Sequence, residues 1–455
     1  MNNFIYLQNN KIIINIYNFF LVISMCSLFY YFCVNINVIG GGSVAILGLL
    51  IFFVLCVNSI LLRIFFDSDV YLKKSLYFLC LFFWYFLFRV IADGQELSFL
   101  ISKTLNTSTG MILFLLIGSF TSFFLNKLTS DSINLRNGLK KYNLIFFIFL
   151  IFYSGITFYT SFSLVSSLSG DKLLIDGIGN QYQRPGNFLT ISFYLFSFIY
   201  TTYNVLNNKT NIAIFIFYIV VSFTGMFNSQ VFGSNSGLAG VGGISFITIL
   251  FVMFLASKRS REILSVTRLS IKKLIISKLA NHIYKYIILA IMIFILSLII
   301  MMAYFDISFS MLRVSDFGSG NTSISSRLDL WIYFIENFSY SPFLGDLIVE
   351  EVVGTDNYVH SLIAYMLTHL GVLGTLLFLF YIFIAVNEVI AETNRENDIR
   401  VKSLTLYSII LFIVVFVLGI LTTTMYWIVL WFSIGFTFSP FKLNSRKNHF
   451  KFNLL

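Results

Sequence analysis

The stretch SLTLYSIILFIVVFVLGI, residues 403–420, contains no charged residue, and a second apolar run follows it after a single leucine. A helix of about 20 apolar residues crosses the hydrocarbon core of a bilayer, which is about 30 Å thick. The whole chain is 58% hydrophobic and only 11% charged, whereas about a quarter of the residues of a soluble domain are charged. These features predict an all-α polytopic membrane protein.

Twelve runs of this kind occur along the 455 residues. They lie at 13–34, 43–62, 75–92, 108–126, 143–165, 187–206, 211–228, 237–256, 286–305, 361–386, 403–420 and 422–438. We therefore expect about 12 transmembrane helices in a single integral membrane domain, 1–455. The longest polar segments are 257–285 and 306–360.

The lysines and arginines indicate the orientation of the spans. Positive residues favour cytoplasmic loops. If the N-terminus is cytoplasmic, 24 of the 30 Lys and Arg residues fall on the cytoplasmic side. The other six lie outside or at outer helix ends: Arg89, Lys103, Lys172, Arg184, Arg313 and Arg327. Both termini are then cytoplasmic, and 306–360 is a large extracytoplasmic loop. The net charge of +10 follows from this topology, with some attraction to anionic lipid, and does not indicate nucleic acid.

Arginines in the sparse outer loops are candidate anion-binding residues. Arg184 lies in GIGNQYQRPGN, where Pro185 and Gly186 form a turn at the start of a span. A guanidinium holds a phosphate through two parallel hydrogen bonds. The alternative for Arg184 is a helix-end anchor that reaches the lipid headgroups.

Arg327 opens SSRLDLWIYFIENFSYSPFLG, in which Ser326 and Asp329 have the spacing of a helix N-terminal cap. Apolar residues at helical spacing follow, and Pro342 ends the pattern. The sequence predicts a short amphipathic helix on the outer membrane surface, with Arg327 in its first turn, where a helix N-terminus favours pyrophosphate. The alternative is a surface helix with an incidental arginine. Arg313 is equally consistent with a second clamp and with an interfacial anchor.

His360 lies in DNYVHSLIAY, at the mouth of a predicted span and shortly after Asn357. A histidine side chain titrates near neutral pH, so it can accept a proton from a sugar hydroxyl or stabilise a leaving phosphate. A purely structural interfacial histidine is the alternative. We expect His369, further along the same run, to be a buried hydrogen-bonding residue. No Walker loop and no HExxH or Cys/His cluster occurs, so neither ATP hydrolysis nor a metal or other cofactor is expected.

Segment 310–375 resembles the C-terminal signature of the O-antigen polymerase and ligase family. An arginine that leads into a helix with tryptophan (SISSRLDLW), a Pro-hydrophobic-Gly step (SPFLG), and a histidine before a Gly-rich step (VHSLIAYMLTHLGVLG) follow in the family's order. QYQRPGN resembles the arginine that precedes another span of the family. The chain departs from the pattern at Ser361, where the family has Asn, and at Thr368 and His369, where it has an acidic residue. It departs again in VFGSNSGLAG, which lacks an arginine.

The resemblance implies a glycosyltransferase of the bacterial inner membrane. Such enzymes transfer a glycan from undecaprenyl pyrophosphate to an acceptor at the outer face, without nucleotide or metal. Arg184 and Arg327 would bind the pyrophosphate, Arg313 and Asn357 would contact substrate, and His360 would orient or deprotonate the acceptor hydroxyl or assist the leaving group. A chain-length regulator is a further expected partner, beside membrane lipid.

Three functions stay open at this point. The first is a polymerase of O-antigen or capsule. The second is an O-antigen ligase or protein O-oligosaccharyltransferase of the same family. The third, from another class, is a polysaccharide flippase or transporter. A transporter is expected to carry ionisable groups near the membrane midplane or broken helices, whereas the polar groups of this chain gather in outer loops.

We predict that 306–360 faces the outside of the plasma membrane. A cysteine introduced at Ser319 is expected to react with an impermeant thiol reagent on intact cells, or on spheroplasts where an outer wall blocks access. A cysteine at Ser270 is expected to react only after permeabilisation. The reverse labelling pattern would overturn the topology and the site assignments that depend on it.

Overall fold

The structure is a computed structural model in which helices account for almost all described residues. It describes residues 50, 54, 70–92, 105–134, 136–165, 183–208, 211–232, 234–256, 334, 338–346, 361–396, 398–422, 425–439 and 441–443. The elements in chain order are β1 (Val70–Leu72), α3 (Ser75–Ala92), α5 (Leu105–Asn134), α6 (Arg136–Val165), α7 (Gln183–Asn207), α8 (Ile212–Val231), α9 (Asn235–Ala256), α15 (Leu362–Arg395), α16 (Ile399–Thr422), α17 (Ile428–Phe438) and β2 (Phe441–Leu443).

Seven of these helices are long and apolar enough to cross a membrane. They are Ser75–Ala92, Gly138–Phe162, Pro185–Asn207, Ile212–Val231, Asn235–Leu255, Leu362–Arg395 and Ile399–Thr422, and each coincides with a predicted run. Met111–Asn126 and Ile428–Phe438 are shorter apolar helices. The chain is therefore an all-α polytopic membrane protein. The predicted spans 13–34, 43–62 and 286–305 lie outside the described residues, apart from two helical positions, 50 and 54.

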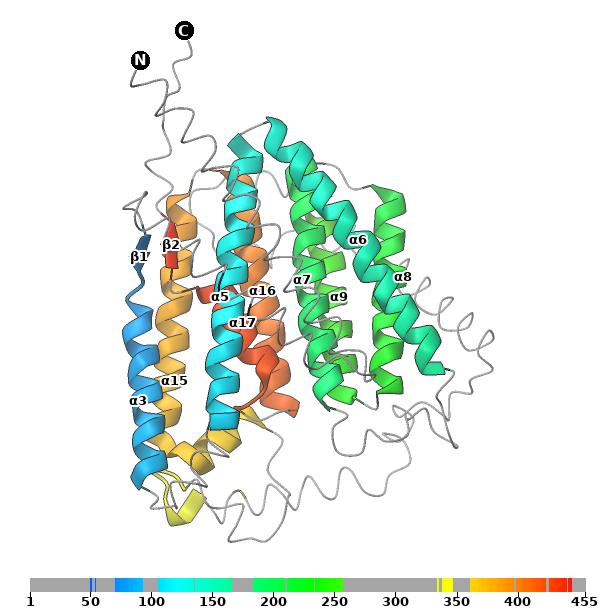
Figure 1. The fold of residues 1–455 in the computed structure, drawn as a ribbon. Helices are drawn as coiled ribbons and strands as arrows, with labels where there is room; N and C mark the ends of the chain where they lie inside the picture. The colour runs from blue at the N-terminus through cyan, green and yellow to red at the C-terminus, as the bar shows by residue number, and fades with distance from the viewer. Residues whose placement is uncertain are drawn as a thin grey trace.

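Successive helices alternate in direction, which gives the bundle two distinct faces (Figure 1). α3, α6, α8 and α16 begin at the upper end in this view, and α5, α7, α9 and α15 begin at the lower end. The upper end, which we call the basic face, carries Lys73, Lys74, Lys140, Arg395, Arg400 and Lys402. The helix ends that the sequence analysis assigns to the outside share the opposite face. Which face is extracytoplasmic remains the prediction made above.

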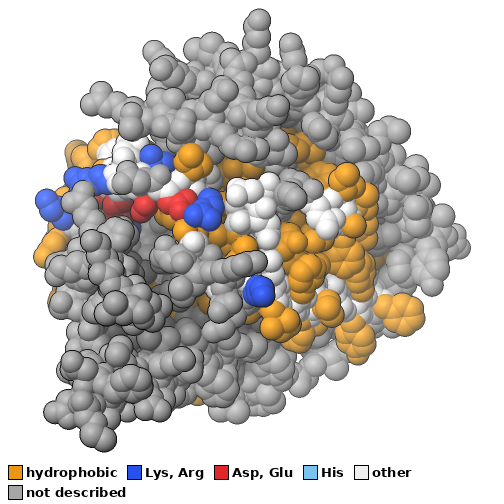
Figure 2. Space-filling model, turned by 90° about the horizontal axis from the view of Figure 1, so that it is seen from above, with side chains coloured by type: hydrophobic (Ala, Val, Ile, Leu, Met, Phe, Trp, Pro, Cys, Tyr) orange, Lys and Arg blue, Asp and Glu red, His pale blue; other side chains and the backbone are white. Residues whose placement is uncertain are grey.

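Acidic side chains on the basic face tie α3 to α15. The Glu388 carboxylate accepts the backbone N–H groups of Lys74 and Ser75, at 3.0 and 3.2 Å, and so stabilises the positive end of α3. Lys73 pairs with Glu392 at 3.4 Å. Figure 2 looks onto this face and shows acidic side chains flanked by Lys and Arg. Short strands β1 and β2, which the sequence analysis did not predict, pair antiparallel here, although every described transmembrane helix lies between them in sequence.

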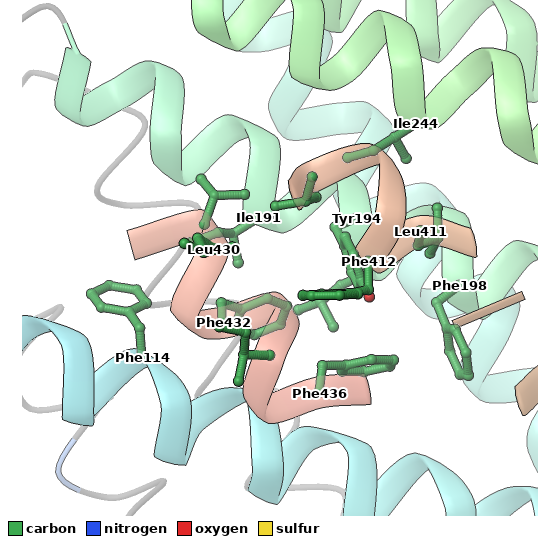
Figure 3. Packing of buried hydrophobic residues seen from close by; sticks show 14 of the residues in the cluster. Phe114, Ile191, Tyr194, Phe198, Ile244, Leu411, Phe412, Leu430, Phe432 and Phe436 are labelled. Carbon is green, nitrogen blue, oxygen red and sulfur yellow. The ribbon is translucent and has the colours of Figure 1, made fainter. Parts of the chain in front are cut away.

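α7 and α17 occupy the centre of the bundle. Almost every residue of α7 is buried, as is α17 from Val429 to Phe438. Phe432 and Phe436 of α17 lie between α5 and α7 (Figure 3), and Phe436 packs on Phe198 with ring centroids 4.8 Å apart. The core is therefore aromatic and excludes lipid as well as water.

The last predicted span, 422–438, differs in the structure. Thr422 ends α16, and α17 begins only at Ile428. Its 11 residues rise about 16 Å, or about half the hydrocarbon thickness. Thr437 donates to the carbonyl of Ser408, well inside α16, so α17 ends level with the middle of that helix. The hydropathy of 422–438 indicated an apolar segment, but hydropathy alone does not distinguish a helix of half the membrane thickness from a full span.

Hydroxyl and amide groups bond across the described helices. Thr248 of α9 and Tyr407 of α16 lie 2.6 Å apart, and Ser197 of α7 and Tyr218 of α8 lie 2.8 Å apart. Asn228 of α8 accepts a hydrogen bond from Ser161 of α6. Such pairs join helices where lipid supplies no hydrophobic drive for association. Charged residues of the described helices, by contrast, lie in the first or last two turns of each helix.

Gly435 and Gly118 allow α17 and α5 to approach until their backbones touch. A Cβ atom at Gly435 would overlap the carbonyl oxygen of Leu115, and one at Gly118 would overlap that of Phe432. We therefore expect Gly435→Ala to lower the free energy of unfolding by about 1–3 kcal/mol, the usual cost of overpacking. The melting temperature of the purified protein in detergent measures this effect.

Gly155 supplies the matched control, because a Cβ there would meet nothing within 4 Å. Gly155→Ala is expected to leave the melting temperature unchanged or slightly raised, since alanine is the better helix former. Equal melting temperatures for the two variants would contradict the close α5–α17 contact.

Candidate functional site

The SPFLG and HLGVLG stretches meet at the face opposite the basic face. α15 contains a break at Gly371, whose φ and ψ are 65° and −173°. Gly345, with φ 72°, lies against this break. A Cβ atom on either glycine would overlap the backbone around the other, so both positions require glycine. The two motifs, which are separate in the sequence, therefore form one structural unit.

The break divides α15 into a short helix, 362–370, and a spanning helix, 372–395. Figure 1 shows the first turns of α15 lying across the lower end of the bundle before the chain turns upward. The apolar run 361–386 predicted one continuous span, and this was wrong for the part that precedes Gly371. The spanning helix rises about 36 Å, which suffices to cross the bilayer.

Backbone groups freed by the break are bonded to residues 342–346. Pro342 and Phe343 accept the N–H groups of Val372 and Leu373, at 2.9 and 3.2 Å. The N–H of Asp346 donates to Thr368, at 2.8 Å. An interruption of a membrane helix is stable where protein groups complete the lost bonds in this way. We call residues 338–346 the finger.

α3 holds this junction through two buried or half-buried polar side chains. The Tyr85 hydroxyl lies 2.9 Å from the carbonyl of Leu370 and 3.1 Å from that of Leu344. Arg89, only 7% exposed, donates from Nη2 to the carbonyl of Gly345 at 2.8 Å. The sequence predicted that Arg89 lies at an outer helix end and suggested no role for it. In the structure, Arg89 binds the backbone of the protein itself.

His369 is buried beside the junction, as the sequence predicts. It is 4% exposed, and its ring stacks on Tyr365 with centroids 3.8 Å apart. Nδ1 lies 2.9 Å from the carbonyl oxygen of Tyr365. A carbonyl can only accept, so Nδ1 carries the proton of this hydrogen bond. His369 lies at the end of the short helix, beside the break, and not deeper in a continuous span.

The beginnings of α7 and α9 lie in contact on the same face. Gly186 packs so closely on Ser234 that a Cβ would overlap the serine hydroxyl. The Ser234 hydroxyl also accepts the N–H of Gly237, at 3.0 Å, and so caps α9. The RPGN and GSNSG stretches are therefore neighbours, although most of α7 and the whole of α8 separate them in sequence.

The start of α17 joins these two helices to the region of the break. The Trp427 indole donates to the side-chain oxygen of Asn187 in α7, at 2.8 Å. Its neighbour Tyr426 packs edge-on against Tyr365 of the short helix, with ring centroids 5.6 Å apart. A continuous set of contacts thus runs from the first turn of α7 to the Gly345–Gly371 junction.

Most of the predicted site residues fall outside the described part of the chain. Arg313, Arg327, Asn357 and His360 lie there, and of Arg184 only the backbone is described, in the first turn of α7. For the predicted amphipathic helix, Phe334 and Phe338 stack with centroids 5.9 Å apart. The structure joins the segments next to two of the predicted residues, Arg184 and His360, through Trp427 and Tyr426.

Asn187, Trp427, Tyr85 and Arg89 were missed by the sequence reasoning. Trp427 and Asn187 carry no motif, and only their contact reveals them. Arg89 had a detectable signal, because an arginine inside an otherwise apolar helix requires a partner. Searches with the sequence and structure find no matching family model, no similar curated protein and no similar solved structure.

We expect Tyr85→Phe to loosen the junction, because it removes the hydroxyl near two carbonyls and preserves the ring. A hydrogen bond of this kind contributes about 1 kcal/mol, and hydrogen exchange at residues 343–346 and 369–373 should rise accordingly. Tyr77→Phe is the matched control on the same helix, since Tyr77 is exposed. Unchanged exchange in Tyr85→Phe would contradict the role assigned to this hydroxyl.

Proposed function

We propose that this protein is a bacterial surface polysaccharide polymerase of the inner membrane. It transfers a growing O-antigen or capsule chain from undecaprenyl pyrophosphate to a lipid-linked repeat unit at the outer face. The proposal rests on one observation: the N-termini of α7, α9 and α17 meet on the face opposite the basic face. Arg184 belongs to the first turn of one of them.

Helix beginnings favour anions, because their unpaired N–H groups and the helix dipole present positive charge. The beginnings of α7 and α9 meet here through Gly186, Ser234 and Gly237, and α17 joins them through the hydrogen bond from Trp427 to Asn187. Arg184, whose backbone lies in the first turn of α7, would add the guanidinium that binds pyrophosphate. The stretch VFGSNSGLAG lacks the arginine found in the family, and instead it places the N-terminus of α9 beside the N-terminus of α7.

The proposed reaction is a single displacement at the anomeric carbon of the donor glycan. The acceptor hydroxyl oxygen forms the new glycosidic bond, and the bond from that carbon to the pyrophosphate oxygen breaks. Arg184 and Arg327, with Arg313 as a second clamp, neutralise the charge that develops on undecaprenyl pyrophosphate. Asn357 contacts substrate, and His360 takes the hydroxyl proton, orients that hydroxyl or assists the departure of the pyrophosphate. No metal or nucleotide takes part, and both chain termini are cytoplasmic.

A ligase or protein O-oligosaccharyltransferase uses the same leaving group and the same residues on another acceptor. The segments joined by Trp427 and Tyr426 serve either reaction equally. The polymerase is preferred because such enzymes are more numerous and more variable in sequence.

A transporter is the second candidate function, and α17 is the observation that favours it. α17 ends near the level of Ser408, in the middle of α16, and half-helices that end in the membrane hold ions or substrates in transporters. The break in α15 is less indicative, because it lies at the face of the bundle and leaves a complete span behind it. Neither α17 nor residues 403–422 of α16 contain Asp, Glu, Lys, Arg or His.

The glycan profile of a deletion strain distinguishes the candidates. A polymerase deletion is expected to retain single-repeat glycan and lose long chains. Accumulation of carrier-linked polymer would indicate a ligase, and repeat units trapped on the cytoplasmic side would indicate a flippase. Either result would overturn the polymerase assignment.

Arg327→Lys is expected to abolish most polymer in the complemented strain, although it keeps the positive charge. Lysine offers no planar pair of donors to a phosphate. Lys172→Gln removes a cation of the same predicted face outside the motifs and is expected to leave polymer unchanged. Wild-type polymer from Arg327→Lys would reduce this residue to a generic cation or anchor.

His360→Ala is expected to abolish polymer while protein level and membrane insertion stay normal. His369→Ala, which removes a buried ring stacked on Tyr365, is expected to lower the melting temperature and reduce polymer less. Polymer that survives in His360→Ala would leave DNYVHSLIAY as an interfacial cap without a catalytic role.

A further inference from the structure

The finger presents three large apolar side chains away from the protein. Tyr340 is 87% exposed, Phe343 is 73% exposed and Leu344 is 44% exposed. Contiguous apolar surface of this kind marks an interaction site in a folded protein, since contact with water is unfavourable for it. The finger therefore requires an occupant for these side chains.

The conformation of the finger is fixed by hydrogen bonds. Pro342 and Phe343 bond to the start of the spanning part of α15, and the carbonyl of Leu344 bonds to Tyr85. A further backbone bond joins Gly345 to Ser341, at 2.9 Å. These bonds fix the backbone from which the exposed side chains project.

The exposed side chains of the finger continue the outer surface of two membrane spans. α3 carries a row of exposed residues at helical spacing: Tyr77, Leu81, Trp84, Phe88 and Ile91. α15 carries a second row: Leu373, Leu376, Phe380 and Phe383. Leu373 is bonded through its N–H to Phe343 itself, and Figure 1 shows the finger below the lower end of α3. The exposed apolar residues of the finger therefore lie next to the exposed row of α15.

The depth of the finger follows from its partners. Arg89, in the last turn of α3, donates to Gly345, so the finger lies at the level where α3 leaves the hydrocarbon. Trp and Tyr concentrate at the membrane–water interface, where their amphipathic rings sit at the level of the headgroups. Tyr340 suits that position, and the apolar side chains of Phe343 and Leu344 suit the adjoining hydrocarbon.

We propose that the finger is a lipid-inserted anchor, with Tyr340, Phe343 and Leu344 in contact with the acyl chains of the leaflet on the face opposite the basic face. The occupant is membrane lipid, because the exposed faces of α3 and α15 that the finger extends are themselves lipid-facing. The Gly345–Gly371 junction then borders lipid on the side of the finger. Lipid contact by the finger does not require glycosyl transfer.

The test places a spin label at residue 343 of the full chain in nanodiscs, in a variant whose native cysteines are all replaced by alanine. Collision rates with oxygen, which concentrates in lipid, are compared with those of a water-soluble nickel chelate. The oxygen-to-nickel ratio at Phe343→Cys is expected to match the ratio at Trp84→Cys on the face of α3. It is expected to exceed several-fold the ratio at Asn394→Cys, an exposed site on the basic face.

A label at Tyr340→Cys repeats the measurement, so that failure of one variant to fold leaves the test intact. Nickel collisions at both positions as frequent as at Asn394→Cys would place the finger in water and overturn the proposal. Low collision rates with both reagents would show that protein, either another segment or a second copy, covers these side chains, and would overturn it equally. Neither result says whether the wild-type chain forms polymer, so this test and the test of the proposed function can fail independently.

Discussion

Backbone hydrogen bonding at the break in α15 is the constraint on which this face of the protein depends. Hydrocarbon offers no partner to a free N–H or C=O, so a helix interrupted where it enters the membrane must have its bonds completed by protein. The N–H groups of Val372 and Leu373 lose their intrahelical acceptors and donate instead to the carbonyls of Pro342 and Phe343. The carbonyls of Thr368 and Leu370 accept hydrogen bonds from the Asp346 N–H and the Tyr85 hydroxyl. The position of the finger, the burial of Arg89 and the two left-handed glycines follow from this one requirement.

The same constraint explains why uncharged groups join the helices within the membrane region, whereas charged groups lie at the helix ends. Hydroxyls, amides and close glycine contacts hold the helices together, and charges are confined to helix ends. On the basic face, Glu388 accepts the backbone N–H of Lys74, and Glu392 pairs with the Lys73 side chain. Burial raises the pKa of the Asp398 carboxyl, but hydrogen bonds from Arg400 outweigh this effect and leave that pKa below its ordinary value. Among the described residues, the opposite face gathers helix N-termini and few charged side chains, which is consistent with the anionic substrate proposed above.

The sequence predicted what hydropathy and charge can encode. Nine of the twelve apolar runs correspond to described helices, and the alternation of helix direction matches the lysine and arginine pattern.

Hydropathy failed where apolar residues do not form a continuous span: α17 is a half-helix, and α15 breaks at Gly371. Gly371 sits in a run that scores as apolar throughout, and its left-handed conformation depends on Gly345, which lies in an earlier segment of the chain. Asn187 and Trp427 were unpredictable for the same reason, because a contact between residues 240 positions apart leaves no local pattern. Arg184, Arg313, Arg327, Asn357 and His360 stay predictions from motif and topology.

Reconstitution of the purified protein in liposomes tests the central claim most directly. The substrate is an undecaprenyl-pyrophosphate-linked repeat unit, supplied without nucleotide and in the presence of a chelator. We expect lipid-linked chains that lengthen by whole repeat units, with one undecaprenyl pyrophosphate released for each bond formed. Substrate that stays at a single repeat, or that merely moves to the other leaflet, would contradict it.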